Sequence, residues 1–177
     1  MFLIESSTRS ALSGPELIAE KITLPSQAPR LSRSRLLELL EKSLRTCTST
    51  VISGRAGTGK TALALDLARS CRRQVTWYKV DAPEADLESF FHYLISSIRQ
   101  ARPRFGTEAL IPLLRRTAGP DQVHRLAEAF VYELVEGETK PLLVVIEDLH
   151  LVCDADWLVP FFRRLLPLLP AEVHMLI

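Results

Sequence analysis

A glycine-rich segment that ends in lysine and threonine is the part of this chain best suited to do chemistry. Residues 54–61 match the pattern G-x-x-x-x-G-K-[ST] in full. Successive backbone N–H groups of such a turn cradle phosphate oxygens at the positive end of the next helix, the lysine reaches the β- and γ-phosphates, and the threonine hydroxyl ligates Mg²⁺. We therefore predict a nucleoside triphosphate or diphosphate site at Gly54, Arg55, Ala56, Gly57, Thr58, Gly59, Lys60 and Thr61.

The residues on both sides of this loop predict the elements that would position it. A β-branched run, residues 50–53, indicates a strand that leads in, and residues 61–69 are strong helix formers. A Cβ at Gly54 or Gly59 would block the turn or the phosphate. Strand, loop and helix thus follow one another in the order that a phosphate site requires, which argues against a chance match.

Two acidic residues supply the second half of the predicted site. Glu147 and Asp148 follow an unbroken apolar run, residues 142–146, which is typical of a parallel strand buried on both faces. In P-loop ATPases an acid at the end of such a strand positions Mg²⁺, and a neighbouring carboxylate orients or deprotonates the attacking water. We assign the metal to Thr61 and Glu147, and catalysis to Lys60 and Asp148.

Alternatives stay open for this acidic pair. Asp is the commoner residue at the first position, and Glu is one methylene longer, so the metal geometry could be looser and hydrolysis slower. A register shifted by one residue would put Asp148 on the metal with no base beside it. The two acids could also be exposed residues at a strand end, without a role in chemistry.

Other polar and aromatic residues have two interpretations each. His150 could sense the γ-phosphate, although a hydrogen-bonded structural histidine is the simpler interpretation. Trp77 and Tyr78 could stack on a base, although aromatic residues in strands belong more often to the core. Arg33 and Arg35 could touch the nucleotide, although exposed helix charges are the default.

The composition limits the class of protein. The 177 residues are 47% hydrophobic and 24% charged, which is typical of one globular domain. A net charge of +1 excludes a strongly basic nucleic-acid surface in this segment. The three cysteines lack metal-ligand spacing and indicate reduced thiols. Without a signal peptide or an apolar stretch of about 18 residues, we expect a cytoplasmic protein with no membrane partner.

Predicted strands and helices alternate along the chain. Residues 1–30 indicate a lead-in arm with little fixed structure, and residues 31–177 indicate the nucleotide-binding domain. Besides the elements named above, we expect helices over 31–44, from Asp81-Ala-Pro83 to Ile98, 123–134 and 157–169, one short helix within 102–120, and strands over 74–80 and 173–177. This alternation predicts an α/β fold, a three-layer sandwich with a parallel sheet.

The chain resembles the nucleotide-binding domain of the STAND class of signalling ATPases. It is most similar to the MalT-like members of the LuxR-type ATP-dependent transcriptional regulators. The resemblance covers roughly residues 20–177. It is carried by residues 21–25, 33–37, 54–61, 76–81, 90–94, 144–150 and 165–170.

The resemblance implies a P-loop NTPase fold of the ASCE type and a switch. Such a switch rests with ADP bound, self-associates with ATP when an inducer is sensed, and is reset by slow hydrolysis. Adenine is implied by the resemblance, and no Asn/Thr-Lys-x-Asp guanine motif follows the acids. The family continues into a last core strand, a lid, helical repeats and often a DNA-binding domain. We therefore expect a domain that is incomplete at its C-terminus, with DNA bound only by a domain not present here.

Two other functions stay open. A P-loop kinase of a small molecule would need an acceptor pocket and an arginine-bearing lid, and no arginine-rich lid segment is evident between the predicted strands. A scaffold module would use the nucleotide only to stabilise its fold, without turnover.

Overall fold

The computed structural model describes residues 17–26, 33–116, 122–136 and 140–177. Most of the predicted lead-in arm, residues 1–16 and 27–30, lies outside these ranges. No helix in the described ranges is long and apolar enough to cross a membrane. The cytoplasmic location stays a prediction.

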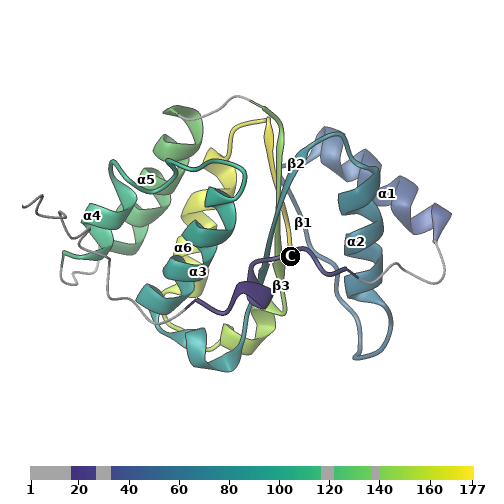
Figure 1. Ribbon diagram of the computed structural model, residues 1–177, viewed down its shortest axis with the longest axis horizontal. Coiled ribbons are helices and arrows are strands. Elements are labelled where there is room, and N and C mark those ends of the chain that lie inside the picture. Colours follow the sequence, from purple (N-terminus) through teal and green to yellow (C-terminus); the bar gives the residue numbers. More distant parts are fainter. Residues whose placement is uncertain (1–16, 27–32, 117–121, 137–139) are drawn as a thin grey trace, which may run out of the picture.

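Four parallel strands form one sheet in the order β1-β4-β3-β2. The strands are β1 (Ser49–Thr50), β2 (Gln74–Lys79), β3 (Leu142–Glu147) and β4 (Val173–Leu176). The first five residues of β3 are buried, as expected for an apolar run between two neighbouring strands. The predicted parallel sheet is confirmed, and its strands run downward in Figure 1.

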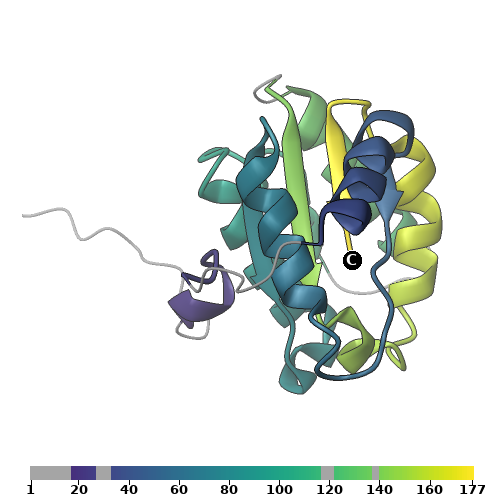
Figure 2. The ribbon, with the colours of Figure 1, turned by 90° about the vertical axis from the view of Figure 1, so that its right-hand side faces the viewer.

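Helices cover both faces of the sheet (Figure 1). On one face lie α1 (Ser34–Thr46) and α2 (Lys60–Ser70). On the other face lie α3 (Leu87–Arg99) and α6 (Leu158–Leu165), with α5 (Gln122–Glu136) packed on α6 and α4 (Leu110–Leu114) packed on α5. The predicted three-layer α/β sandwich is confirmed, and Figure 2 shows it from the side of α1 and α2.

Each face of the sheet has its own hydrophobic core. The stripe of α3 is buried or partly buried in the larger core, as its spacing predicts, and consists of Leu87, Phe90, Phe91, Leu94, Ile95 and Ile98. Leu40 and Leu44 of α1 are buried in the smaller core on the opposite face. Leu36 of the same helix is 38% exposed and lies outside this core.

Predicted element boundaries are wrong at two places in the first half of the chain. The strand expected over residues 50–53 ends at Thr50, because the chain leaves the sheet to enter the phosphate-binding loop, although Ile52 still donates its N–H to Ile177 O. The helix signal at Asp81 opens only a 3₁₀ turn, Ala82–Ala85. The helix α3 begins at Leu87, where the side chain of Asp86 accepts a hydrogen bond from Ser89 N at 2.8 Å.

The helix expected over residues 157–169 is also shorter than predicted. The helix α6 covers Leu158–Leu165 and is followed by a 3₁₀ turn, Leu166–Leu168. Pro160 lies in the first turn of α6, where its missing N–H costs no helical hydrogen bond.

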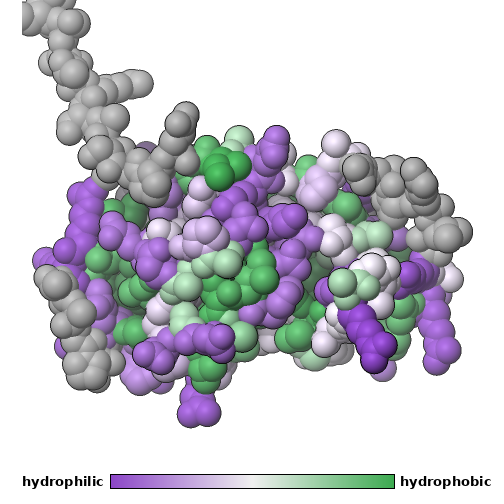
Figure 3. Space-filling view, turned by 90° about the horizontal axis from the view of Figure 1, so that it is seen from below, coloured by the Kyte–Doolittle hydropathy of each residue, from purple (hydrophilic) through white to green (hydrophobic). Residues whose placement is uncertain are grey.

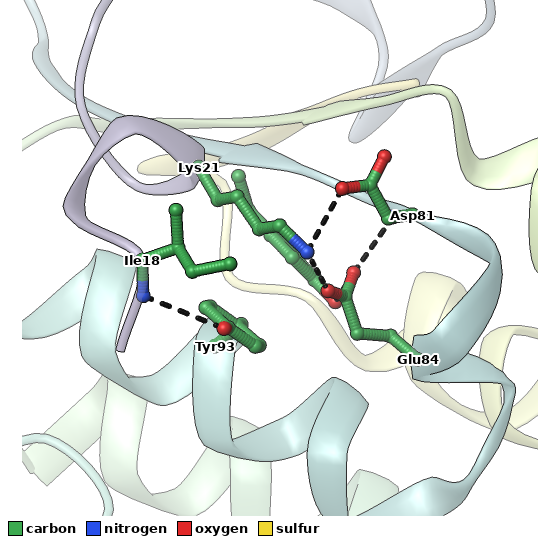
Figure 4. Close-up of polar contacts among 6 residues, drawn as sticks. Ile18, Lys21, Asp81, Glu84 and Tyr93 are labelled. Atoms are coloured by element: carbon green, nitrogen blue, oxygen red, sulfur yellow. Dashed lines mark hydrogen bonds and ion pairs between the residues drawn. The ribbon is translucent and has the colours of Figure 1, made fainter. Parts of the chain in front are cut away.

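Residues 17–26 pack against the edge strand β2 and the helix α3, so the expectation of little fixed structure is wrong for this part of the arm. A 3₁₀ turn, Ala19–Lys21, carries the Lys21 ammonium between two carboxylates, those of Asp81 at 2.9 Å and Glu84 (Figure 4). Ile22 is buried, and its carbonyl accepts a hydrogen bond from Gln100 Nε2 at 2.8 Å. Contacts with residues far along the sequence therefore hold this segment in place.

A candidate nucleotide-binding site at the carboxyl edge of the sheet

The phosphate-binding loop joins β1 to α2. Gly59 caps α2 with φ of 81°, a left-handed conformation that residues with a Cβ seldom adopt. Thr58 closes the loop by donating its N–H (3.3 Å) and its hydroxyl (2.9 Å) to Arg55 O. The Lys60 ammonium lies over the loop, where it donates to Gly54 O at 3.0 Å and to Arg55 O at 3.3 Å. The glycines thus permit a tight turn whose lysine points back across it.

Most backbone N–H groups of this loop are available to a ligand. Within the described chain, Thr58 is the one residue between Gly54 and Gly59 whose N–H donates to a backbone carbonyl. A Cβ added at Gly54 would come within 2.9 Å of Thr58 Oγ1, so this glycine is required by a close approach within the turn. Free N–H groups at the start of a helix favour binding of an anion such as phosphate.

A cleft of about 900 Å³ opens beside the loop. It lies between the loop and the segment that follows β3, which includes Leu149, His150 and Leu151. Figure 3 looks onto this edge of the molecule and shows apolar surface exposed among hydrophilic residues. The volume is within the range of pockets that hold small molecules. The phosphate-binding loop and Asp148 line the cleft, and Glu147 lines a smaller adjoining pocket together with Lys60, Thr61 and Asp148.

The structure brings Thr61 and Glu147 into direct contact at the inner end of the site. The Thr61 hydroxyl, on the first turn of α2, donates a short hydrogen bond to Glu147 Oε1 at the end of β3. The Trp77 indole N–H donates to Glu147 Oε2 at 3.2 Å. Sequence reasoning paired the first two residues but did not include Trp77, because nothing in its local pattern distinguishes it from a core residue.

This corner fits Mg²⁺ bound together with a nucleotide. Thr61 and Glu147 supply oxygen atoms, which Mg²⁺ prefers. No group of three or more His, Cys, Asp or Glu side chains that could hold a metal occurs in the described part of the chain. Mg²⁺ commonly uses one or two protein ligands and takes its other ligands from phosphates and water, so this small set suffices.

Asp148 follows in a strained backbone conformation. Its φ of 59° makes it the one non-glycine residue with positive φ among those described, and Asp tolerates this region better than most residues. The turn carries Asp148 to the cleft wall, where Oδ1 lies 4.0 Å from Nδ1 of His150. The His150 side chain is 69% exposed and makes no hydrogen bond within the described residues, so the interpretation as a hydrogen-bonded structural histidine is not supported, and a role in sensing the γ-phosphate stays a prediction.

The chain matches the AAA ATPase domain family over residues 30–177. It belongs to this family. A search of curated proteins found no match to the chain. Membership implies that the domain binds ATP or ADP with Mg²⁺ and hydrolyses ATP, and the match includes both the phosphate-binding loop and the acidic pair.

In this AAA ATPase domain, Arg33 lies closer to the loop than its sequence context indicates. It immediately precedes α1, and a Cβ added at Gly59 would lie 2.9 Å from Arg33 Nη2. The guanidinium therefore stands against the loop glycine rather than on a remote helix face. Arg33 is also exposed, as the alternative interpretation of a solvent-facing charge expects, so its contact with a nucleotide stays a prediction.

The two strand aromatics have different surroundings in this domain. Tyr78 is fully buried in the larger core, and Trp77 is 2% exposed within the smaller one. Neither ring is open for a base to stack on it, so the prediction that both belong to the core is confirmed.

Proposed function

We propose that this AAA ATPase domain is the ATP- and ADP-binding switch module of a signal-transducing transcriptional regulator of the STAND class. Its resting state holds ADP, and ATP drives self-association of the full-length protein. Slow ATP hydrolysis resets the switch. DNA is bound by another domain of that protein, and the MalT-like LuxR-type regulators are the group to which the sequence motifs point.

The contact between the Thr61 hydroxyl and the Glu147 carboxylate carries the nucleotide part of this proposal. It joins the helix that follows the phosphate loop to the end of the central strand β3, through two residues that are 86 positions apart in the sequence. No cation of the described residues forms an ion pair with Glu147. The site therefore offers a carboxylate to an external cation, as a Mg-nucleotide site must.

Each remaining site residue has a proposed role. The Lys60 ammonium exchanges its two loop carbonyls for the β- and γ-phosphates, a charge-assisted contact that is stronger than the bonds it replaces. Residues 54–59 bind phosphate oxygens through backbone N–H groups. Asp148 orients the attacking water and accepts its proton as the water oxygen bonds to the γ-phosphorus, while the bond from the γ-phosphorus to the bridging oxygen breaks and ADP leaves.

Slow hydrolysis is supported by the way the two acids lie. Glu147 already has hydrogen bonds to both oxygens, and Asp148 sits on the cleft wall with its side chain 30% exposed and near His150. Because water reaches Asp148, the electrostatic activation of the attacking water is weaker than in a closed site from which solvent is excluded. Slow turnover suits a module in which hydrolysis acts as a timer.

Calorimetric titration with Mg-ADP and Mg-ATP tests the proposal. We expect both nucleotides to bind, ADP at least as tightly as ATP, and Lys60→Ala to weaken binding at least about 100-fold because a charged phosphate contact is lost. Lys42→Ala, which removes an exposed lysine of α1, is the matched control and should bind as the native chain does.

Other outcomes would point to the alternative functions. Nucleotide binding without measurable ATP turnover would indicate a scaffold module, and binding of neither nucleotide by the folded protein would contradict the nucleotide site itself. Phosphate transfer to a small acceptor faster than to water would indicate a kinase. Light scattering of the full-length protein, with ADP and with a slowly hydrolysed ATP analogue, tests self-association, and equal masses in the two states would contradict a switch.

A further inference from the structure

Both oxygens of the Glu147 carboxylate are held by the protein. Oε1 accepts the Thr61 hydroxyl and Oε2 accepts the Trp77 indole N–H at 3.2 Å. Two donors on different elements, one on α2 and one on β2, leave the carboxylate little freedom to rotate. The metal-facing group of the site is therefore oriented before a ligand arrives.

The register of the sheet explains how Trp77 reaches this carboxylate. Trp77 pairs with Val145 across the β2–β3 ladder, and Glu147 lies two residues beyond Val145, so all three side chains project from the same face. The indole is 2% exposed and packs in the core with Leu143 and Val145. Because this packing fixes the ring, its N–H is a rigid donor.

The second donor matters more for Glu147 than it would for an aspartate. Glutamate has one more rotatable bond than aspartate, and therefore more carboxylate positions for the same backbone. Holding one oxygen on Thr61 still allows the other oxygen to move. The indole removes this freedom, so it compensates for the longer side chain.

We propose that Trp77 is a positioning residue of the metal site. Its indole N–H holds Glu147 in the orientation that receives the Mg²⁺ of a bound nucleotide, and Trp77 itself touches neither metal nor phosphate. This inference rests on the proposed nucleotide site. It adds Trp77, on the neighbouring strand β2, to the residues that determine how nucleotide affinity depends on the Mg²⁺ concentration.

The test compares Trp77→Phe with Trp157→Phe, a matched control. Trp157 also donates its indole N–H, to Ala85 O at 2.8 Å, but it lies on the far side of the sheet. ADP affinity is measured by calorimetry over a range of Mg²⁺ concentrations and in EDTA. We expect Trp77→Phe to raise the Mg²⁺ concentration for half-maximal tight binding about tenfold or more, with ADP affinity in EDTA unchanged, and Trp157→Phe to leave both unchanged.

A double-mutant cycle shows whether Trp77 acts through Glu147. In a Glu147→Gln background, Trp77→Phe should have no further effect on the Mg²⁺ dependence. The inference is overturned if Trp77→Phe lowers only the melting temperature, or if its effect on Mg²⁺ is the same in both backgrounds. If the native chain binds no nucleotide at all, the proposed function fails instead, so the two failures are distinguishable.

Fluorescence provides a measurement that does not depend on the folding of Trp77→Phe. The chain has two tryptophans, so Trp157→Phe leaves Trp77 as the one indole emitter. Adding Mg²⁺ to this variant with ADP should shift the Trp77 emission, because a divalent charge arrives beside the carboxylate it holds. Unchanged emission at saturating Mg-ADP would overturn the inference.

Discussion

Trp77 and Tyr78 are neighbours on β2, and each donates a hydrogen bond to a glutamate on a different face of the sheet. Trp77 donates to Glu147 and Tyr78 donates to Glu84, both at 3.2 Å. Glu84, which is 3% exposed, also accepts the N–H of Asp81 at 2.7 Å and pairs with the Lys21 ammonium. Glu147 has no such cation among the described residues.

This difference separates a structural carboxylate from a binding carboxylate. Burying a carboxylate is costly unless a counter-charge and hydrogen bonds accompany it. The chain supplies Glu84 with its own lysine, so that this group joins the arm to the sheet. Glu147 is only partly buried and lies at the wall of the proposed Mg²⁺ site. The described residues provide no cation to pair with it, so its carboxylate is available to a bound metal ion.

The largest effect should come from removing the internal cation. Lys21→Ala leaves Glu84 buried without a counter-charge, and breaking such a pair costs about 3–5 kcal/mol. Because Lys21 is 12% and Asp81 45% exposed, we expect the lower end, about 3 kcal/mol of unfolding free energy, measured by urea denaturation. Lys42→Ala is the control, and a loss below about 1 kcal/mol for Lys21→Ala would remove the distinction between the two carboxylates.

The next largest effect concerns turnover at the residue after Glu147. Asp148→Asn should slow ATP hydrolysis about 100-fold, since a general base is lost, and leave ADP affinity unchanged. Asparagine also tolerates the left-handed backbone, so the fold should persist. Phosphate release is the measurement, with the exposed Asp156→Asn as control. An unchanged rate would show that the water is activated elsewhere.

Neutralising each glutamate in turn sharpens the comparison. Glu147→Gln should weaken Mg-ADP binding about tenfold and change unfolding free energy by less than about 1 kcal/mol. Glu84→Gln should do the reverse, with a stability loss of about 2 kcal/mol because an amide NH₂ replaces an acceptor, and with unchanged nucleotide affinity. Mg-ADP affinity is measured by calorimetry and unfolding free energy by urea denaturation, on both variants. If the two variants lose affinity and stability to a similar extent, our interpretation of the two carboxylates is contradicted.

The smallest effect is a pH dependence of the unfolding free energy that comes from His174. This buried side chain has hydrogen bonds but no ion pair among the described residues. Its ring bonds Thr50 Oγ1 and Cys47 O, each at 2.9 Å. Burial lowers the pKa of His174 below its usual 6.5, and the Arg73 charge lowers it further, against the opposing effect of the Cys47 carbonyl. Because the folded state disfavours the protonated ring, the full stabilisation is present above pH 6.5 and is lost as the pH falls below it.

We expect the unfolding free energy to fall between pH 7.5 and 5.5 in urea denaturation, by no more than about 1.4 kcal/mol for each pH unit below 6.5. His174→Gln should flatten this slope, whereas His124→Gln, at an exposed position, should keep it. A slope that persists in His174→Gln would assign the titration to another group.

Local patterns predicted much of the fold. The apolar run 142–146 lies in β3, because a strand buried on both faces needs apolar residues at every position. The apolar stripe of α3 is buried, because a helix that packs on one face has apolar residues at a spacing of three and four. Boundaries were less predictable. The Asp81 signal formed a true capping box, but the chain continued for one 3₁₀ turn before α3 began at Leu87.

The chain of residues by itself determined the phosphate-binding loop, the acidic pair and the parallel α/β class, since glycine conformation and strand composition are local properties. Only the tertiary structure decided that β4 lies between β1 and β3, that Glu147 meets Thr61, and that Trp77 holds Glu147 from 70 residues away. The same is true of Lys21, which reaches Glu84 across 63 positions. Such pairs depend on strand order and register, and these follow from how whole layers pack together.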